Sequence, residues 1–219
     1  MIEIKNLLDT SKTIAKEIFE NKTYPFEVLP EIGEFILKLQ KTLDENEFNV
    51  SDGNVYIHKS VKVYETANIF GPCIIDEGTE VRPGAFIRGN AIVGKNCVVG
   101  NSTELKNVII FDNVQVPHYN YVGDSVLGFK SHMGAGSITS NVKSDKTLVK
   151  VKDGDKIIET GLKKMGAVLG DNVEVGCNSV LNPGAIVGRQ SNIYPLSCVR
   201  GTVPANSIFK AQGNIVEKY

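Results

Sequence analysis

The sequence lacks the features that define several classes of protein. Its formal net charge is −1, from 24 basic and 25 acidic residues among 219, so no global charge attracts nucleic acid or an anionic membrane surface. No segment approaches the roughly 18 consecutive apolar residues of a membrane-spanning helix, and the start has no apolar stretch with a small-residue cleavage site. These absences favour a cytoplasmic protein that binds neither nucleic acid nor membrane.

Cysteine and histidine are few and scattered. The four cysteines, Cys73, Cys97, Cys177 and Cys198, show neither CxxC spacing nor the density of a disulfide framework. We interpret them as small core or corner residues. Only three histidines are present, and their spacing does not suit a shared metal ion within one subunit. We therefore expect no metal.

A six-residue repeat of aliphatic residues runs through the middle of the chain. Its first run is Ile57, Val63, Ile69, Ile75, Val81, Ile87, Val93, Val99 and Leu105. The pattern continues, with two five-residue steps, at Ile110, Val116, Val122, Leu127 and Met133, and later at Leu169, Val175, Leu181, Val187, Ile193 and Val199. This period fits no helix and predicts short strands joined by turns, with three flat faces closing an 18-residue triangular coil.

The repeat predicts an all-β fold, a parallel β-helix of hexapeptide repeats with a short N-terminal helical segment. The pattern resembles the hexapeptide-repeat family, and that resemblance implies a left-handed coil. Glycines follow several of the aliphatics, including Gly94, Gly100 and Gly176. We expect these glycines to supply left-handed or strained turn conformations.

The flanks depart from the repeat. Residues 1–50 have helical apolar spacing, which predicts a helical cap over the open end of the solenoid, or alternatively a docking segment for a partner. The β-helix then covers 51–210, and 211–219 form a C-terminal tail. A charged insertion at 142–165, with the turn signal Asp153-Gly154-Asp155, predicts a loop that serves the site or contacts a partner.

Two cations are spaced to bind an anion. Arg88 and Lys106 are 18 residues apart, so they stack on successive coils about 4.8 Å apart and point outward. Like charges this close are tolerated in water but are more favourable with an anion between them. We interpret the pair as a phosphate clamp. The alternative is a solvated pair of long side chains whose spacing is accidental.

His118 lies one corner before the face that carries these cations. An imidazole can accept a proton from an amine at neutral pH, so His118 is a candidate general base, although a lone surface histidine often has no role. The short step after Leu105 places Tyr121 over Glu104. A carboxylate, a phenol and a histidine therefore gather with the cations around one corner.

The order and spacing of these motifs resemble a known family. The stretches that carry the resemblance are 99–106, 118–124 and 134–141, together with Arg88. They are similar to the acetyltransferase domain of bifunctional glucosamine-1-phosphate acetyltransferase/N-acetylglucosamine-1-phosphate uridyltransferase, and more so to related sugar-1-phosphate nucleotidylyltransferase C-terminal domains. No glycine-rich phosphate loop is present, so uridylyl transfer is not expected.

The resemblance implies an N-acetyltransferase that moves an acetyl group from acetyl-CoA to a hexosamine 1-phosphate, in a homotrimer with active sites between neighbouring subunits. It makes His118 the general base, with Glu104 orienting the imidazole. It assigns Arg88 and Lys106 to the sugar phosphate.

Three further positions concern the acceptor. By the same resemblance, Tyr121 and Asn141 contact the sugar. His132 stands where the bifunctional enzymes have an asparagine. Binding the sugar, acting as a second acid or base, and a purely structural surface role all remain open for His132, so the acceptor sugar itself is open.

The site for acetyl-CoA is expected near the end of the repeat. Gly134 and Ala135 are candidate contacts for acetyl-CoA, and amides of their turn or of a neighbouring subunit are candidates for binding the oxyanion. Lys210, or else Arg200, is the candidate for binding CoA phosphate. Two other functions stay open: acetylation of a different acceptor, and a non-catalytic scaffold or regulatory partner of a separate sugar nucleotidylyltransferase.

Overall fold

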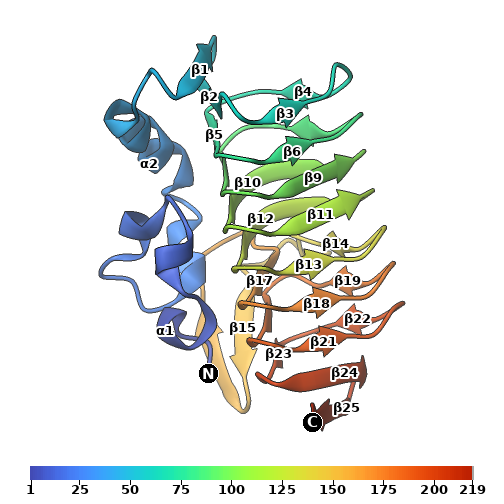
Figure 1. Cartoon of the computed structure of the whole chain (residues 1–219). Coiled ribbons are helices and arrows are strands. Elements are labelled where there is room, and N and C mark those ends of the chain that lie inside the picture. The colour runs from blue at the N-terminus through green and yellow to red at the C-terminus, as the bar shows by residue number, and fades with distance from the viewer. Residues whose placement is uncertain (219) are drawn as a thin grey trace.

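The computed structural model describes residues 1–218 and shows a triangular β-solenoid of about nine turns with a helical segment along one side (Figure 1). Successive coils pair in parallel through backbone hydrogen bonds, and the repeat aliphatics point into the solenoid. The predicted all-β, left-handed parallel β-helix is confirmed.

The solenoid has three faces. Face 1 consists of β2 (Val55–His58), β5 (Cys73–Ile75), β8 (Ala91–Val93), the ends of β10 (Glu104–Ile110) and β12 (Tyr121–Leu127), β17 (Ala167–Leu169), β20 (Ala185–Val187) and β23 (Thr202–Val203). Face 2 consists of β3 (Lys62–Val63), β6 (Glu80–Val81), β9 (Val98–Asn101), β11 (Gln115–His118), β13 (His132–Met133), β18 (Glu174–Val175), β21 (Asn192–Ile193) and β24 (Ser207–Ala211). Face 3 consists of β4 (Asn68–Ile69), β7 (Phe86–Ile87), the beginnings of β10 and β12, β14 (Ile138–Thr139), β19 (Val180–Leu181) and β22 (Cys198–Val199).

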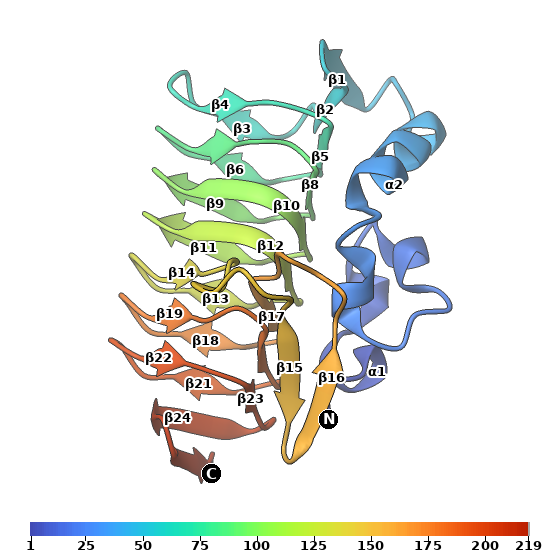
Figure 2. The ribbon, with the colours of Figure 1, turned by 180° about the vertical axis from the view of Figure 1, so that it is seen from behind.

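The N-terminal segment lies along face 1 and does not cap the open end (Figure 2). Its helical elements are α1 (Ile4–Leu7), η1 (Thr10–Lys12), η2 (Lys16–Phe19), η3 (Pro25–Val28), α2 (Ile32–Leu39) and η4 (Gln40–Thr42), followed by β1 (Phe48–Ser51), which pairs antiparallel with β2. The first coil stays open, and Val63 in it is 40% exposed. The expected position of the cap is therefore wrong.

The outward side of face 1 explains this placement. Its strands carry an apolar residue at the outward central position, whereas the equivalent position on face 2 is mostly polar. Each of these residues is at most 1% exposed: Ile74, Ile92, Ile109, Val126, Val168 and Ile186. A parallel strand that is apolar on both sides has to be covered on both sides. The N-terminal segment covers β8, β10 and β12 of this face, and β15 (Lys150–Asp153) of the insertion packs against β23.

Polar contacts fix the segment in position. The carboxylate of Asp171 accepts the backbone N–H of Asp9 at 2.8 Å and that of Phe129 at 2.9 Å. Farther along, Gln40 Nε2 donates to the carbonyl of Asn54 at 2.8 Å. Because Asp171 is only 5% exposed, both amides depend on it for a partner.

The glycines that follow the repeat aliphatics act differently from our expectation. Gly100 and Gly176 are not in the left-handed region, but a Cβ on either would lie within 2.4 Å of backbone atoms of the next coil. Their function is close approach between coils. The left-handed corners are formed largely by asparagines such as Asn96 and Asn178, both with φ of 53°.

The cysteines divide into two pairs. Cys73 and Cys97 are buried, as expected, and burial raises the pKa of each thiol to about 12. Cys177 and Cys198 are exposed, so they are not core residues. All four are free thiols.

The insertion and the C-terminus are ordered hairpins. The insertion contains β15 (Lys150–Asp153) and β16 (Lys156–Glu159), joined at the expected turn. The chain after β24 returns as β25 (Asn214–Glu217), antiparallel to β24. Residues 211–218 are therefore not a simple tail, and Tyr219 of the predicted tail lies outside the described residues.

The anchor of the N-terminal segment gives a stability prediction. Asp171→Ala leaves two backbone amides without their acceptor, which we expect to lower the free energy of unfolding by about 2–4 kcal/mol. Chemical denaturation measures this change, and hydrogen exchange should report early opening near Asp9. Asp155→Ala, which removes an exposed carboxylate from the hairpin turn, is the control. Equal stability of the two variants would contradict the anchoring role.

Candidate functional site

Two coils differ from the others at the corner between faces 3 and 1. There β10 and β12 pass around the corner as continuous strands, in five-residue steps. Asn107 and Asp124 occupy the corner with φ of 55° and 47°. Asn and Asp enter the left-handed region more readily than most residues. The shortened steps thus place two polar side chains on adjacent coils.

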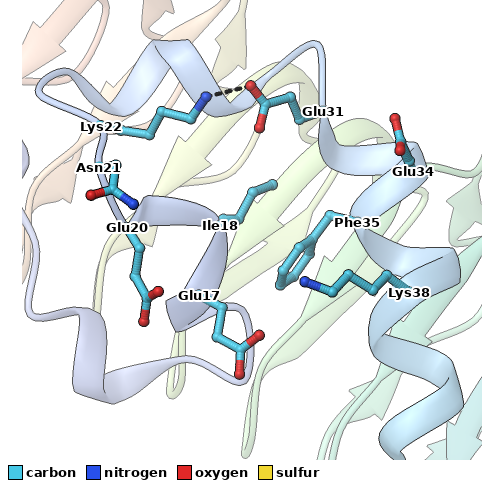
Figure 3. Close-up of a pocket in the computed structure, with 9 residues that line it drawn as sticks. All are labelled: Glu17, Ile18, Glu20, Asn21, Lys22, Glu31, Glu34, Phe35 and Lys38. Carbon is cyan, nitrogen blue, oxygen red and sulfur yellow. Dashed lines mark hydrogen bonds and ion pairs between the residues drawn. The ribbon is translucent and has the colours of Figure 1, made fainter.

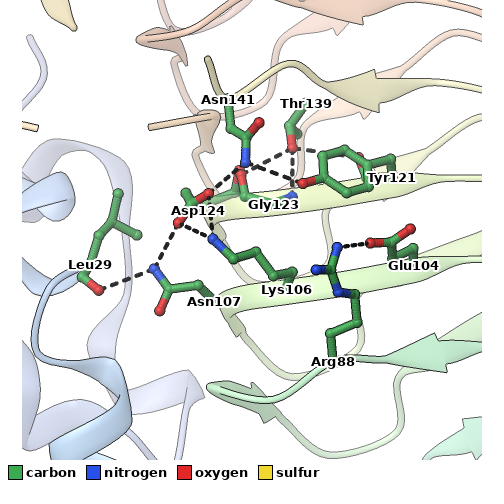
Figure 4. Close-up of polar contacts among 11 residues, drawn as sticks. Leu29, Arg88, Glu104, Lys106, Asn107, Tyr121, Gly123, Asp124, Thr139 and Asn141 are labelled. Carbon is green, nitrogen blue, oxygen red and sulfur yellow. Dashed lines mark hydrogen bonds and ion pairs between the residues drawn. The ribbon is translucent and has the colours of Figure 1, made fainter. Parts of the chain in front are cut away.

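Asp124 is the centre of the polar network at this corner (Figure 4). Its side chain is 6% exposed and lies 3.1 Å from Lys106 Nζ. It also accepts hydrogen bonds from the side-chain amides of Asn107 and Asn141. Asn141 Nδ2 also donates to the Tyr121 hydroxyl at 3.1 Å. Lys106, Tyr121 and Asn141 are therefore brought together by a carboxylate to which the sequence analysis assigned no role.

Arg88 completes the cluster from the neighbouring coil. Its Nη1 donates to Glu104 Oε1 at 2.7 Å, and this partner raises the pKa of the guanidinium. Arg88 and Lys106 do stack on successive coils, but each is paired with a carboxylate. Neither cation therefore lies without a carboxylate partner, which the sequence analysis did not predict. Guanidinium and ammonium groups still have unused donors for an anion.

His118 ends β11, one corner before Tyr121, and is exposed. Within residues 1–218, no hydrogen bond joins its imidazole to another side chain. Glu104 therefore does not orient His118 here, because its carboxylate binds Arg88. The backbone next to His118 is tightly held, since a Cβ on Gly100 would lie 1.6 Å from the carbonyl oxygen of Pro117.

One backbone amide near His118 is free. In the turn after β13, Gly134 N–H donates to Val175 O and Gly136 N–H donates to His118 O. Among residues 1–218, no acceptor contacts the amide of Ala135. Within the turn Gly134-Ala135-Gly136, Ala135 is therefore the residue whose amide can donate to an oxyanion. It precedes Gly136, whose amide is bonded to the His118 carbonyl.

His132 lies away from this cluster. His132 pairs in register with Gln115 on the adjacent coil. Because Gln115 precedes His118 by three residues, the two histidines are separated by about 10 Å along the strand direction. The Nδ1 of His132 is 2.8 Å from Glu174 Oε2. Within one subunit His132 is thus not grouped with Arg88 and Lys106.

A basic cavity of 680 Å³ lies between the inserted hairpin and the last coils. Four cations line it: Lys143, Lys150, Lys152 and Arg200. Lys150 pairs with Glu159 at 2.7 Å, and Gln212 also lines the cavity. Lys210 is exposed on β24 and does not line this cavity. The hairpin lysines had no recognisable signal in the sequence apart from the charge of the insertion.

A second cavity, of 460 Å³, lies between η2 and α2 and carries mixed charges, with Lys22 paired to Glu31 (Figure 3). It contains no histidine and lies away from the corner cluster. Among residues 1–218, no group of three or more His, Cys, Asp or Glu side chains is arranged to bind a metal ion. Every helix in the same range is too short or too polar to cross a bilayer.

Comparisons with known proteins found a family model, curated relatives and solved structures that match this chain. The family model described as the GMPPB C-terminal domain matches residues 69–191. The bifunctional sugar-1-phosphate nucleotidylyltransferase/acetyltransferase of Sulfurisphaera tokodaii is 33% identical over 77% of this chain and 46% of its own length. The bifunctional protein GlmU of Methanococcus vannielii is 34% identical over 98% of this chain and 53% of its own length. A solved putative acetyltransferase from Bacillus cereus aligns over 76% of this chain and 79% of its own, with 16% identity and a TM-score of 0.43.

The fold and the corner cluster define a hexapeptide-repeat protein of the left-handed β-helix class. Within that class, the chain belongs to the GMPPB C-terminal domain family, whose model covers more than half of it. The resemblance stated from the motifs is confirmed. The chain spans about half the length of the curated relatives it matches.

The central position of Asp124 is testable by stability. Asp124→Ala removes the partner of Lys106 and two amides and places alanine at a left-handed φ, so we expect a loss of about 2–3 kcal/mol in unfolding free energy. Asp124→Asn keeps a residue that tolerates this φ and should lose less. Urea denaturation of both variants measures the difference. Two variants as stable as the parent would contradict the structural role of Asp124.

Proposed function

We propose that this protein is an acyltransferase that moves the acetyl group of acetyl-CoA to the amine of a hexosamine 1-phosphate. The observation that carries the proposal is the corner where Arg88, Lys106, Tyr121 and Asn141 meet one strand away from the exposed imidazole of His118. The names of the relatives, which combine sugar-1-phosphate chemistry with acetyl transfer, support it.

Each residue at the corner has a separate role in the proposed acetyl transfer. Arg88 and Lys106 bind the phosphate, and Tyr121 and Asn141 contact the sugar. The amine nitrogen attacks the thioester carbonyl while His118 accepts the amine proton, the C–S bond breaks, and the CoA thiolate leaves and takes up a proton. The amide of Ala135 donates to the oxyanion that develops during attack. Gly134 contributes shape only, because its own amide is already bonded to Val175.

The basic cavity is the proposed site for the phosphates of CoA. Lys152 and Arg200 face it from the hairpin and from the end of β22, and Lys143 adds a third cation. Clustered cations bind phosphate groups through charge-assisted hydrogen bonds. This assignment replaces Lys210, which lies outside the cavity.

A homotrimer in the cytoplasm is part of the proposal. The N-terminal segment covers face 1, which leaves faces 2 and 3 for contact with other subunits. His118 lies at the edge between those two faces. In this trimer His132, which starts β13 on face 2, contacts the acceptor bound to a neighbouring subunit.

Removing the proposed base tests the function. His118→Ala should lower kcat for free-thiol release from acetyl-CoA with glucosamine 1-phosphate or galactosamine 1-phosphate by 10²–10⁴-fold. His58→Ala, at the corner between faces 1 and 2, is the control and should retain activity. No thiol release with either sugar in the parent protein would refute this acceptor class.

The proposed CoA site is tested with two donors. Lys152→Ala and Arg200→Ala should each raise KM for acetyl-CoA about ten-fold, because a charge-assisted contact to phosphate is lost. Neither should affect acetyl-pantetheine, which lacks the nucleotide. Lys156→Ala, on the same hairpin but outside the cavity, is the matched control. An equal effect on both donors would contradict the assignment.

A further inference from the structure

Two exposed phenylalanines lie beside the phosphate-binding cluster. Phe70 is 58% exposed and Phe86 is 37% exposed. Their ring centroids are 6.0 Å apart and their planes meet at 80°. The rings therefore form a two-sided apolar corner that is open to solvent. Large apolar side chains gathered on a surface usually mark a place where a ligand or partner binds.

The stacking of the coils places Phe70 in line with the two cations. Phe70, Arg88 and Lys106 each follow the inward aliphatic of β4, β7 and β10, which pair in register. The amide of Phe70 donates to Ile87 O at 2.8 Å, and the amide of Arg88 donates to Leu105 O at 2.9 Å. Each step along this column is about 4.8 Å. The aromatic corner is thus one coil beyond Arg88.

Arg88 joins the aromatic corner to the polar cluster. The centre of its guanidinium is 5.9 Å from the centroid of the Phe86 ring, while Nη1 binds Glu104. The side chain is 47% exposed. A guanidinium has five N–H donors, so donors remain for a phosphate that lies next to the rings.

The charges of the cluster balance, so tight binding of an anionic ligand requires a further contact outside the cluster. Two cations, Arg88 and Lys106, are matched by two carboxylates, Glu104 and Asp124. The formal charge of these four groups is zero. A small anion therefore gains little from long-range attraction, whereas a ligand that also stacks on an aromatic ring gains a second contribution.

We propose that Phe70 and Phe86 bind the base of a nucleoside diphosphate-linked amino sugar, and that such a sugar is the preferred acceptor. The hexosamine lies beside Asn141, the two phosphates lie at Lys106 and Arg88, and the base stacks on the exposed rings. This inference rests on the proposed function, because the same amine is acetylated by the same step. Stacking accepts any base, so the rings do not select among nucleosides.

Kinetics with matched acceptors test the inference. The parent protein should show kcat/KM at least about ten-fold higher with UDP-glucosamine than with glucosamine 1-phosphate. Phe70→Ala should remove that advantage through KM and leave glucosamine 1-phosphate unchanged, and Phe70→Trp should restore it. Phe70 is the informative position because the guanidinium of Arg88 lies over the ring of Phe86. Tyr194→Ala, an exposed aromatic elsewhere, is the control.

Binding of UDP alone separates failure of this inference from failure of the proposed function. NMR titration of the parent protein with UDP should shift the ring signals of Phe70, and Phe70→Ala should weaken UDP binding about ten-fold while leaving inorganic phosphate unaffected. This result stands even if no thiol is released with any acceptor. Equal binding of UDP by the parent and Phe70→Ala, or equal kcat/KM for both acceptors, would overturn the inference.

Discussion

Backbone hydrogen bonds between successive coils determine which side chains become neighbours on this protein. Because the coils pair in register, residues about one coil apart in sequence are stacked in columns on the outer surface. Arg88 and Lys106 form such a column, and Glu104 and Tyr121 form the adjacent one. Two shortened steps then turn Asp124 toward Lys106 at the corner. The site therefore results from the register of the coils together with the two five-residue steps of the repeat.

The cover on face 1 is the second constraint. Its strands are apolar on both sides, so the solenoid without residues 1–47 would expose a continuous apolar strip. The cover also reaches the site: Asn107 Nδ2 contacts both the carbonyl of Leu29 and the carboxylate of Asp124. The N-terminal segment therefore stabilises the solenoid and supports the corner that holds Lys106.

Much of this organisation was predictable from sequence. The six-residue period predicts the solenoid, and the 18-residue spacing predicts the neighbours of Arg88, because both depend on backbone geometry alone. The pairing of Arg88 with Glu104 was not predicted, since rotamer choice decides it. The position of residues 1–50 was also indicated by the sequence. Ile74, Ile92 and Ile109 make the outward side of face 1 apolar, and such a face has to be covered. The basic cavity depends on how the insertion folds back, which no local pattern determines.

In the proposed complex, a sugar phosphate binds between Arg88 and Lys106 with its amine directed toward His118. A crystal structure of the complex with glucosamine 1-phosphate tests this most directly. We expect phosphate oxygens within hydrogen-bond distance of the Arg88 guanidinium and Lys106 Nζ, with the sugar against Tyr121. A phosphate bound elsewhere, or an amine directed away from every copy of His118 in the assembly, would contradict it.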